Sequence, residues 1–143
     1  MTERTTAQTI AGLFGVAFIV LGVIGFIPEI TTDYMQFHTW ERHSHAELFG
    51  VFDVSVFQNA IHLVFGIAGL ALSRTLAGAW SYLVGGGVAL VDLAVYGLLI
   101  ERSSRANFVP LDAAGCWLHL GLGIGMAAVG LASARAVPRA LPA

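Results

Sequence analysis

Four long apolar segments alternate with shorter polar ones along the chain. They cover residues 7–27, 53–72, 79–100 and 113–134, and most charged residues lie outside them. A bilayer core needs about 20 mostly apolar residues per helix, so each segment is long enough to cross a membrane. The pattern predicts an all-α fold, a four-transmembrane-helix bundle built as two tandem helical hairpins. We expect a single integral membrane domain over residues 1–143, with an outer loop over residues 28–52 that includes a short helix on the membrane surface.

Small and polar residues recur at helical spacing within each apolar segment. Between helices in lipid, apolar contact gives no net drive, whereas small residues permit close approach and polar side chains form hydrogen bonds. We therefore expect these faces to point into the bundle. They are Ala11, Gly15, Phe18, Gly22 and Gly25; Ser55, Asn59, His62, Gly66 and Gly69; Tyr82, Gly85, Ala89, Asp92 and Tyr96; and Asp112, Cys116, His119, Gly123 and Met126.

The second and fourth segments resemble each other. "IHLVFGIAGLALSR" begins at Ile61 and "LHLGLGIGMAAVGLASAR" begins at Leu118. Both read apolar-His-Leu, continue with glycines and end in Ser and Arg. This likeness indicates an internal repeat of one helical hairpin, with both copies in the same orientation in the membrane.

Composition supports the membrane class. Hydrophobic residues make up 57% of the chain and charged residues 11%, whereas soluble domains are about a quarter charged. All seven basic residues are Arg and they form no patch, so nucleic acid is not expected as a partner. Four of them lie on the side of the two termini, and this excess predicts that both termini of this multi-pass protein are cytoplasmic. The four are Arg4, Arg74, Arg135 and Arg139.

Three ionisable residues share one predicted depth inside the bundle. At a rise of about 1.5 Å per residue, His62, Asp92 and His119 lie roughly 10 to 14 Å below the outer surface. Asn59 and Tyr96 lie one turn nearer that surface. Because an intramembrane charge is costly and tends to pair, we expect Asp92 to pair with one of the histidines.

Three interpretations of this intramembrane cluster remain open. Its side chains form hydrogen bonds that hold the helices together; or they bind a small ligand or a proton in a cavity open to the outside; or His62 and His119 ligate a b-type haem or a metal, as paired histidines in bundles do. The chain has no c-type haem motif.

The outer loop contains a second group of histidines. His38, His43 and His45 lie in "HTWERHSH", near Glu41 and Glu47, and such a set can bind zinc or copper. A solvated polar loop explains the same residues.

The sequence shows no nucleophile elbow, phosphate-binding loop, dinucleotide fingerprint or HExxH motif. We therefore expect no enzyme and no obligatory cofactor. The expected role is an accessory or scaffold subunit in the cell membrane, whose partners are the lipid bilayer and a larger membrane complex or further copies of the chain. The alternative is a membrane module that binds a small ligand, a proton, haem or a metal.

Several strings carry a family resemblance. They are "GFIPEITTDY" at Gly25, "AELFGVFDVSVFQNAIHLVFGIAGLALSRT" at Ala46, "YLVGGGV" at Tyr82 and "ANFVPLDAAGCWLHLGLGIGMAAVG" at Ala106. With them the chain resembles the small four-helix membrane proteins of actinobacteria that form the domain-of-unknown-function family 4383. The resemblance implies the four-helix architecture and no activity. His62 and His119 match the family pattern, whereas Asp92 departs from it, which suggests that Asp92 replaces a carboxylate absent at Gly115.

Overall fold

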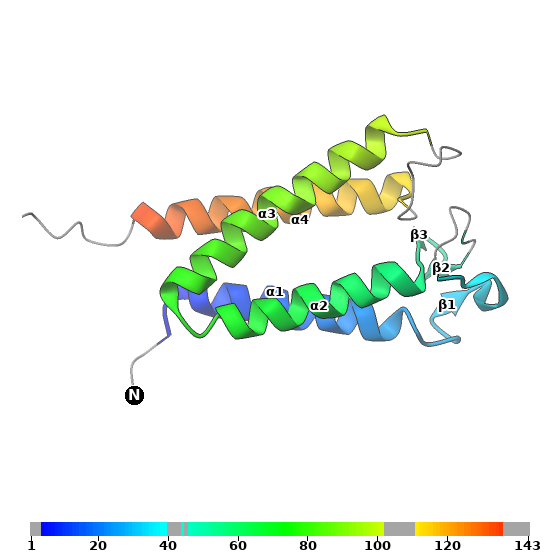
Figure 1. Cartoon of the computed structure of the whole chain (residues 1–143), viewed down its shortest axis with the longest axis horizontal. Helices are drawn as coiled ribbons and strands as arrows, with labels where there is room; N and C mark the ends of the chain where they lie inside the picture. Colours follow the sequence, from blue (N-terminus) through cyan, green and yellow to red (C-terminus); the bar gives the residue numbers. More distant parts are fainter. Residues whose placement is uncertain (1–3, 40–43, 45, 102–110, 136–143) are drawn as a thin grey trace, which may run out of the picture.

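The computed structural model describes residues 4–39, 44, 46–101 and 111–135. Within them, four helices lie side by side as a bundle, which confirms the all-α four-helix prediction (Figure 1). The start of α1, the turn between α2 and α3 and the end of α4 lie together at one end of the bundle. The helices are α1 (Thr6–Ile24), α2 (Val56–Leu72), α3 (Leu76–Leu99) and α4 (Ala113–Arg135).

Helix lengths agree with a membrane protein. Of the described helices, α1, α3 and α4 are long and apolar enough to cross a membrane, and α2, with 17 residues, is somewhat shorter. The ends of all four lie within three residues of the predicted bounds. Each helix follows a side chain whose oxygen accepts a hydrogen bond from the backbone N–H three positions later, as N-caps do. These capping residues are Thr5, Ser55, Thr75 and Asp112.

The two helices of each hairpin touch backbone to backbone at a pair of glycines. A Cβ built on Gly15 would lie 2.9 Å from the carbonyl oxygen of Gly66, and one built on Gly66 would lie 2.6 Å from that of Gly15. The second hairpin has the same arrangement, with 2.7 Å in both directions between Gly87 and Gly123. No larger residue fits at these crossings without moving a helix. Gly66 and Gly123 each follow a histidine by four positions, as the predicted repeat requires, although the repeat itself stays a prediction.

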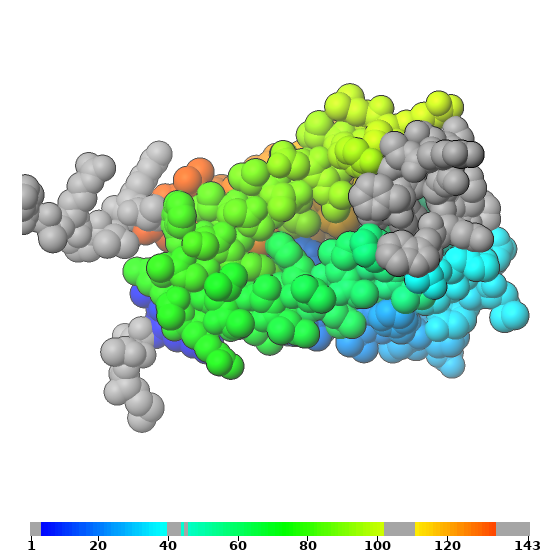
Figure 2. Space-filling model, in the orientation of Figure 1, coloured from blue at the N-terminus to red at the C-terminus, as the bar shows by residue number. Residues whose placement is uncertain are grey.

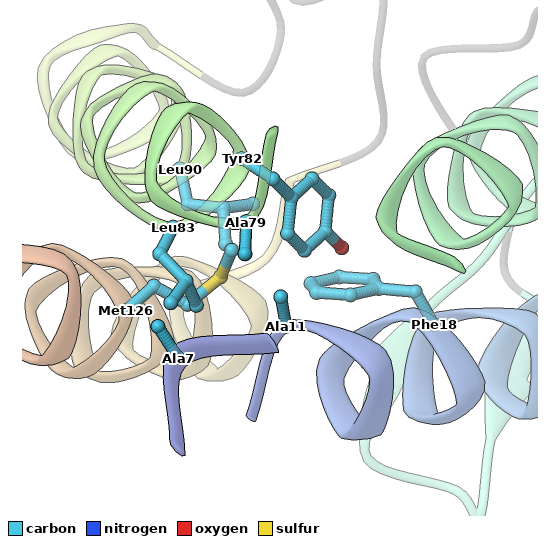
Figure 3. Packing of buried hydrophobic residues seen from close by; sticks show 8 residues of the cluster. All are labelled: Ala7, Ala11, Phe18, Ala79, Tyr82, Leu83, Leu90 and Met126. Carbon is cyan, nitrogen blue, oxygen red and sulfur yellow. The ribbon is translucent and has the colours of Figure 1, made fainter. Parts of the chain in front are cut away.

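A cluster of buried apolar side chains joins the two hairpins. Figure 3 shows Ala7, Ala11 and Phe18 of α1 facing residues of α3, with Met126 of α4 beside them. Small residues again dominate on the α1 side, so α1 and α3 pack closely where the chain enters the bundle. The α3 members of the cluster are Ala79, Tyr82, Leu83 and Leu90.

The outer loop forms a small antiparallel sheet, which the sequence did not predict. Three two-residue strands are arranged in the order β1-β2-β3, with Thr31 opposite Leu48 and Leu48 opposite Phe52. Buried side chains of this region pack against the end of α1. In the described part of the loop, the helical structure is one 3-10 turn, η1 (Tyr34–Gln36), in place of the predicted surface helix. The strands are β1 (Thr31–Thr32), β2 (Glu47–Leu48) and β3 (Phe52–Asp53).

The predicted inward faces are correct for α1, α2 and α4, where every named residue is buried except His62, which is half-buried. The prediction for α3 is wrong at three of its five residues, whereas Tyr82 is buried and Tyr96 is half-buried. Gly85, Ala89 and Asp92 are exposed on the outer side of α3. The physical reason is the run of three glycines at residues 85–87, which offers a small face in more than one direction. Gly87 is the one that meets the backbone of α4.

Replacing a crossing glycine is expected to destabilise the bundle. In Gly15→Ala the new Cβ would lie 2.8 Å from the backbone nitrogen of Leu70, and backbone cannot move aside as a flexible side chain can. We expect a loss of about 1–3 kcal/mol, seen as a lower thermal unfolding midpoint in detergent. The control is Gly125→Ala, because nothing lies within 4 Å of a Cβ there. Equal effects of the two variants would contradict the backbone contact.

The carboxylate of Asp112 is expected to stabilise the start of α4. It accepts hydrogen bonds from the backbone nitrogens of Ala114 at 3.1 Å and Gly115 at 3.0 Å. Asp112→Ala should cost about 0.5–2 kcal/mol, measured by thermal unfolding with helical circular dichroism. Asp112→Asn retains an acceptor oxygen and should lose less than half as much. If Asn is as damaging as Ala, capping does not explain the role of Asp112.

Candidate functional site

Two histidines from different hairpins face each other inside the bundle. The ring centroids of His62 in α2 and His119 in α4 are 6.0 Å apart, with 43° between the ring planes. His119 is 5% exposed and His62 is half-buried. Each histidine lies four residues before the glycine at which its helix crosses its neighbour. The rigid crossings therefore fix where the two imidazoles meet.

The histidine pair continues into a column of aromatic rings. From His62 the next ring is Phe18 of α1 at 5.7 Å, followed by Phe65 of α2 at 4.8 Å and Tyr82 of α3 at 5.0 Å. These separations are those of favourable aromatic pairs. With His119, the column draws side chains from all four helices, and it holds the histidines in an apolar setting.

Two cavities flank the histidine pair, and both are lined by Phe18, Gln58, His62 and His119. The smaller, about 60 Å³, also contacts Asn59 and residues of the outer sheet. The larger, about 140 Å³, lies between α2 and α3. The walls of both are otherwise mostly apolar. Both histidines thus line both of these small cavities.

Several buried polar atoms near this site have no hydrogen-bond partner among the described residues. They include both polar atoms of the Asn59 amide and the hydroxyl of Tyr82. Nδ1 of His119 is a further such atom. The Asn59 side chain packs directly on Gly25, where any Cβ would collide with it. Such groups are rare in folded proteins because each costs free energy. Hydrogen-bonding atoms near the histidines are therefore left without a partner within the described chain.

The structure brings together only part of the predicted cluster. His62 and His119 line both cavities, and Asn59 lines the smaller one. Asp92 does not: it is exposed on the outer side of α3 and lines neither cavity. The predicted pairing of Asp92 with a histidine is therefore wrong. Tyr96 is half-buried and packs instead against the Leu111 and Cys116 cluster.

The sequence interpretation missed two residues of the site. Gln58 is 8% exposed and lines both cavities. It precedes His62 by four positions, so helical spacing already placed the two on one side of α2. Phe18 was predicted to face inward, but nothing in the sequence indicated that its ring would pack on His62.

The geometry does not favour metal or haem binding. Among the described residues, no group of three His, Cys, Asp or Glu side chains is placed to hold a metal ion, whereas protein zinc sites use three or four such ligands. Haem exceeds the size of both cavities, which are smaller than the roughly 300–1,000 Å³ of drug-sized pockets. The predicted loop site stays untested, because His43 and His45 lie outside the described residues and only His38 is within them.

Comparison with known proteins identifies the family and gives no activity. No curated protein and no solved structure matches the chain. One family model, described as a domain of unknown function, matches residues 8–132. This range contains all four helices except the first two residues of α1 and the last three of α4, together with both histidines and the outer sheet. The chain therefore belongs to the family described as Domain of unknown function (DUF4383).

Proposed function

We propose that this protein is a non-enzymatic accessory subunit of the cell membrane, with both termini cytoplasmic, that binds a larger membrane protein through the outer side of α3. The observation that carries this proposal is the exposure of Asp92. Asp92 lies seven residues before the end of α3, or about 10 Å along the helix axis. A carboxylate at this depth and on this side would face lipid.

Such a position is costly for a subunit on its own. An Asp at the centre of a membrane helix costs about 2.5–3.5 kcal/mol on insertion scales. Lys and Arg can reach the interface along their long stems, but the Asp side chain is too short to do so. Within the described part of the chain, no hydrogen bond or ion pair to Asp92 is found. A partner that supplies a donor would remove this cost.

The surroundings of Asp92 suit contact with another helix. Gly85 is exposed on the same side of α3, and a Cβ on it would meet nothing within 4 Å. Small residues let a second backbone approach, and a polar group forms the hydrogen bond that membrane interfaces use. Both features occur together here.

Charge favours an unlike partner over a second copy. Two copies joined by a twofold axis along this side of α3 would bring one Asp92 near the other, because such an interface pairs the same surface with itself. Like charges close together are unfavourable. A partner helix with an Arg, Lys, His or amide side chain at this depth complements the carboxylate. This favours a larger complex over a homo-oligomer.

Photo-crosslinking in the native host membrane tests the proposal. A photoreactive residue at Val88, one turn before Asp92, should give one discrete adduct with a protein other than this chain. The matched control is Val20 on α1, since Val20 and Val88 are 49% and 50% exposed; it should give no such adduct. Asp92→Ala should remove most of the Val88 adduct while leaving thermal stability of the purified chain unchanged.

Three results would contradict the proposal. The adduct could form equally from Val20, or it could persist undiminished in Asp92→Ala. An adduct of twice the 15.1 kDa chain mass would instead indicate a second copy on this side of α3.

A further inference from the structure

The larger cavity beside the histidines has the size of one aromatic ring. It encloses about 140 Å³. An engineered protein cavity of about 150 Å³ lined by Leu, Ile and Phe stays dry and binds benzene. Here Phe18, Phe65, Leu90 and Leu93 supply comparable walls. On size and lining alone, the cavity suits a single six-membered ring.

Polar side chains lie at one part of the cavity wall. Gln58, His62 and His119 all line it, and the two imidazole centroids are 6.0 Å apart. A neutral imidazole carries one hydrogen-bond donor and one acceptor. The cavity surface is otherwise almost wholly apolar, so a ligand oxygen would find its hydrogen-bond partner only at an imidazole edge. A plain hydrocarbon ring would leave that edge unused.

The cavity is open to the side of the bundle. Figure 2 shows the surface hollowed between α2 and α3, with atoms of α1 visible below. Two of the lining residues lie on the outer surface: Ile61 of α2 is 40% exposed, and Ala89 of α3 is exposed. Because α3 is long and apolar enough to cross the membrane, this opening faces lipid. A ligand would enter from the bilayer and must be lipid-soluble.

We propose that the cavity between α2 and α3 binds the head group of a lipid-soluble compound: one six-membered ring with a carbonyl or hydroxyl oxygen, as in quinones and phenols. The ring lies among Phe18, Phe65 and Leu90, and its oxygen bonds to His62 and His119. An apolar tail passes out between Ile61 and Ala89. This inference rests on the cavity and the histidine pair, and it is independent of the proposed association through Asp92.

Equilibrium dialysis of the full chain in lipid nanodiscs tests the site. The probes are a short-tailed benzoquinone, a short-tailed phenol and toluene, and nanodiscs without protein correct for partition into lipid. We expect saturable binding of the quinone, the phenol or both, at one molecule per chain. The probe that binds more tightly identifies whether the oxygen serves as acceptor alone or also as donor. If neither the quinone nor the phenol binds saturably, the proposal is overturned.

Variants separate the polar contacts from the apolar cavity. His62→Leu should weaken binding of the oxygenated probe about tenfold, the effect of roughly 1.4 kcal/mol of hydrogen bonding, and leave toluene binding unchanged. Retained toluene binding shows that the variant is folded. If His62→Leu and the unmodified chain bind all three probes alike, the cavity is only an apolar space and the proposal fails.

A second pair of variants tests the route of entry. Ala89→Phe adds a ring at the rim, on the exposed side of α3, and should abolish binding of all three probes. The matched control is Ala128→Phe on α4, also an exposed alanine but lining neither cavity; it should bind as the unmodified chain does. Undiminished binding by Ala89→Phe would place the ligand elsewhere and overturn the proposal.

Discussion

The backbone contacts between glycines govern the rest of this structure. In lipid, two apolar helices gain little from touching, because lipid tails contact them equally well. Gly15 against Gly66 and Gly87 against Gly123 let the helices of each hairpin approach more closely than any side chain permits. This close approach brings many atoms into van der Waals contact, each contributing little and together contributing much. Each hairpin is thereby a rigid pair.

The contact between the two hairpins is of a different kind. At the end of the bundle where α1 begins, small residues such as Ala7, Ala11 and Ala79 keep α1 and α3 close. Towards the outer sheet, the space between the hairpins is bridged by rings, from Tyr82 to His119. Large planar side chains rarely fill such a space completely. The cavities therefore occur beside the histidines and not within either hairpin.

The sequence predicted the fold well, and the physical reasons are clear. The length of the apolar segments predicted the four helices. The helical spacing of small and polar residues predicted the inward faces of α1, α2 and α4. The spacing of small residues failed to predict the inward face of α3 because residues 85–87 are all glycine. Only the backbone contact with Gly123 shows that Gly87 is the glycine that faces α4. The outer sheet was missed because each strand has two residues. Alternation of polar and apolar residues cannot be recognised over two positions.

The candidate site was predicted in part for the same reasons. His62 and His119 could be placed at one depth because rise per residue is nearly constant in a helix. The side of α3 that faces the bundle depends on which glycine α4 contacts. Depth along the helix axis therefore could not predict whether Asp92 points into the bundle or away from it. Similar depth was mistaken for proximity. The error matters functionally, because a carboxylate inside the bundle would serve the histidines, whereas one outside it requires a partner.

The two proposed surfaces lie on the same helix and are compatible. Asp92 follows Ala89 by three positions, so the two point about 60° apart around α3. Ala89 lines the cavity between α2 and α3, and Asp92 does not. A helix seated along Asp92 and Gly85 would lie beside the opening at Ala89 without entering it. Such a partner would narrow the passage to lipid, so the residence time of a bound ring should lengthen when the partner is present, while the contacts with His62 and His119 stay the same.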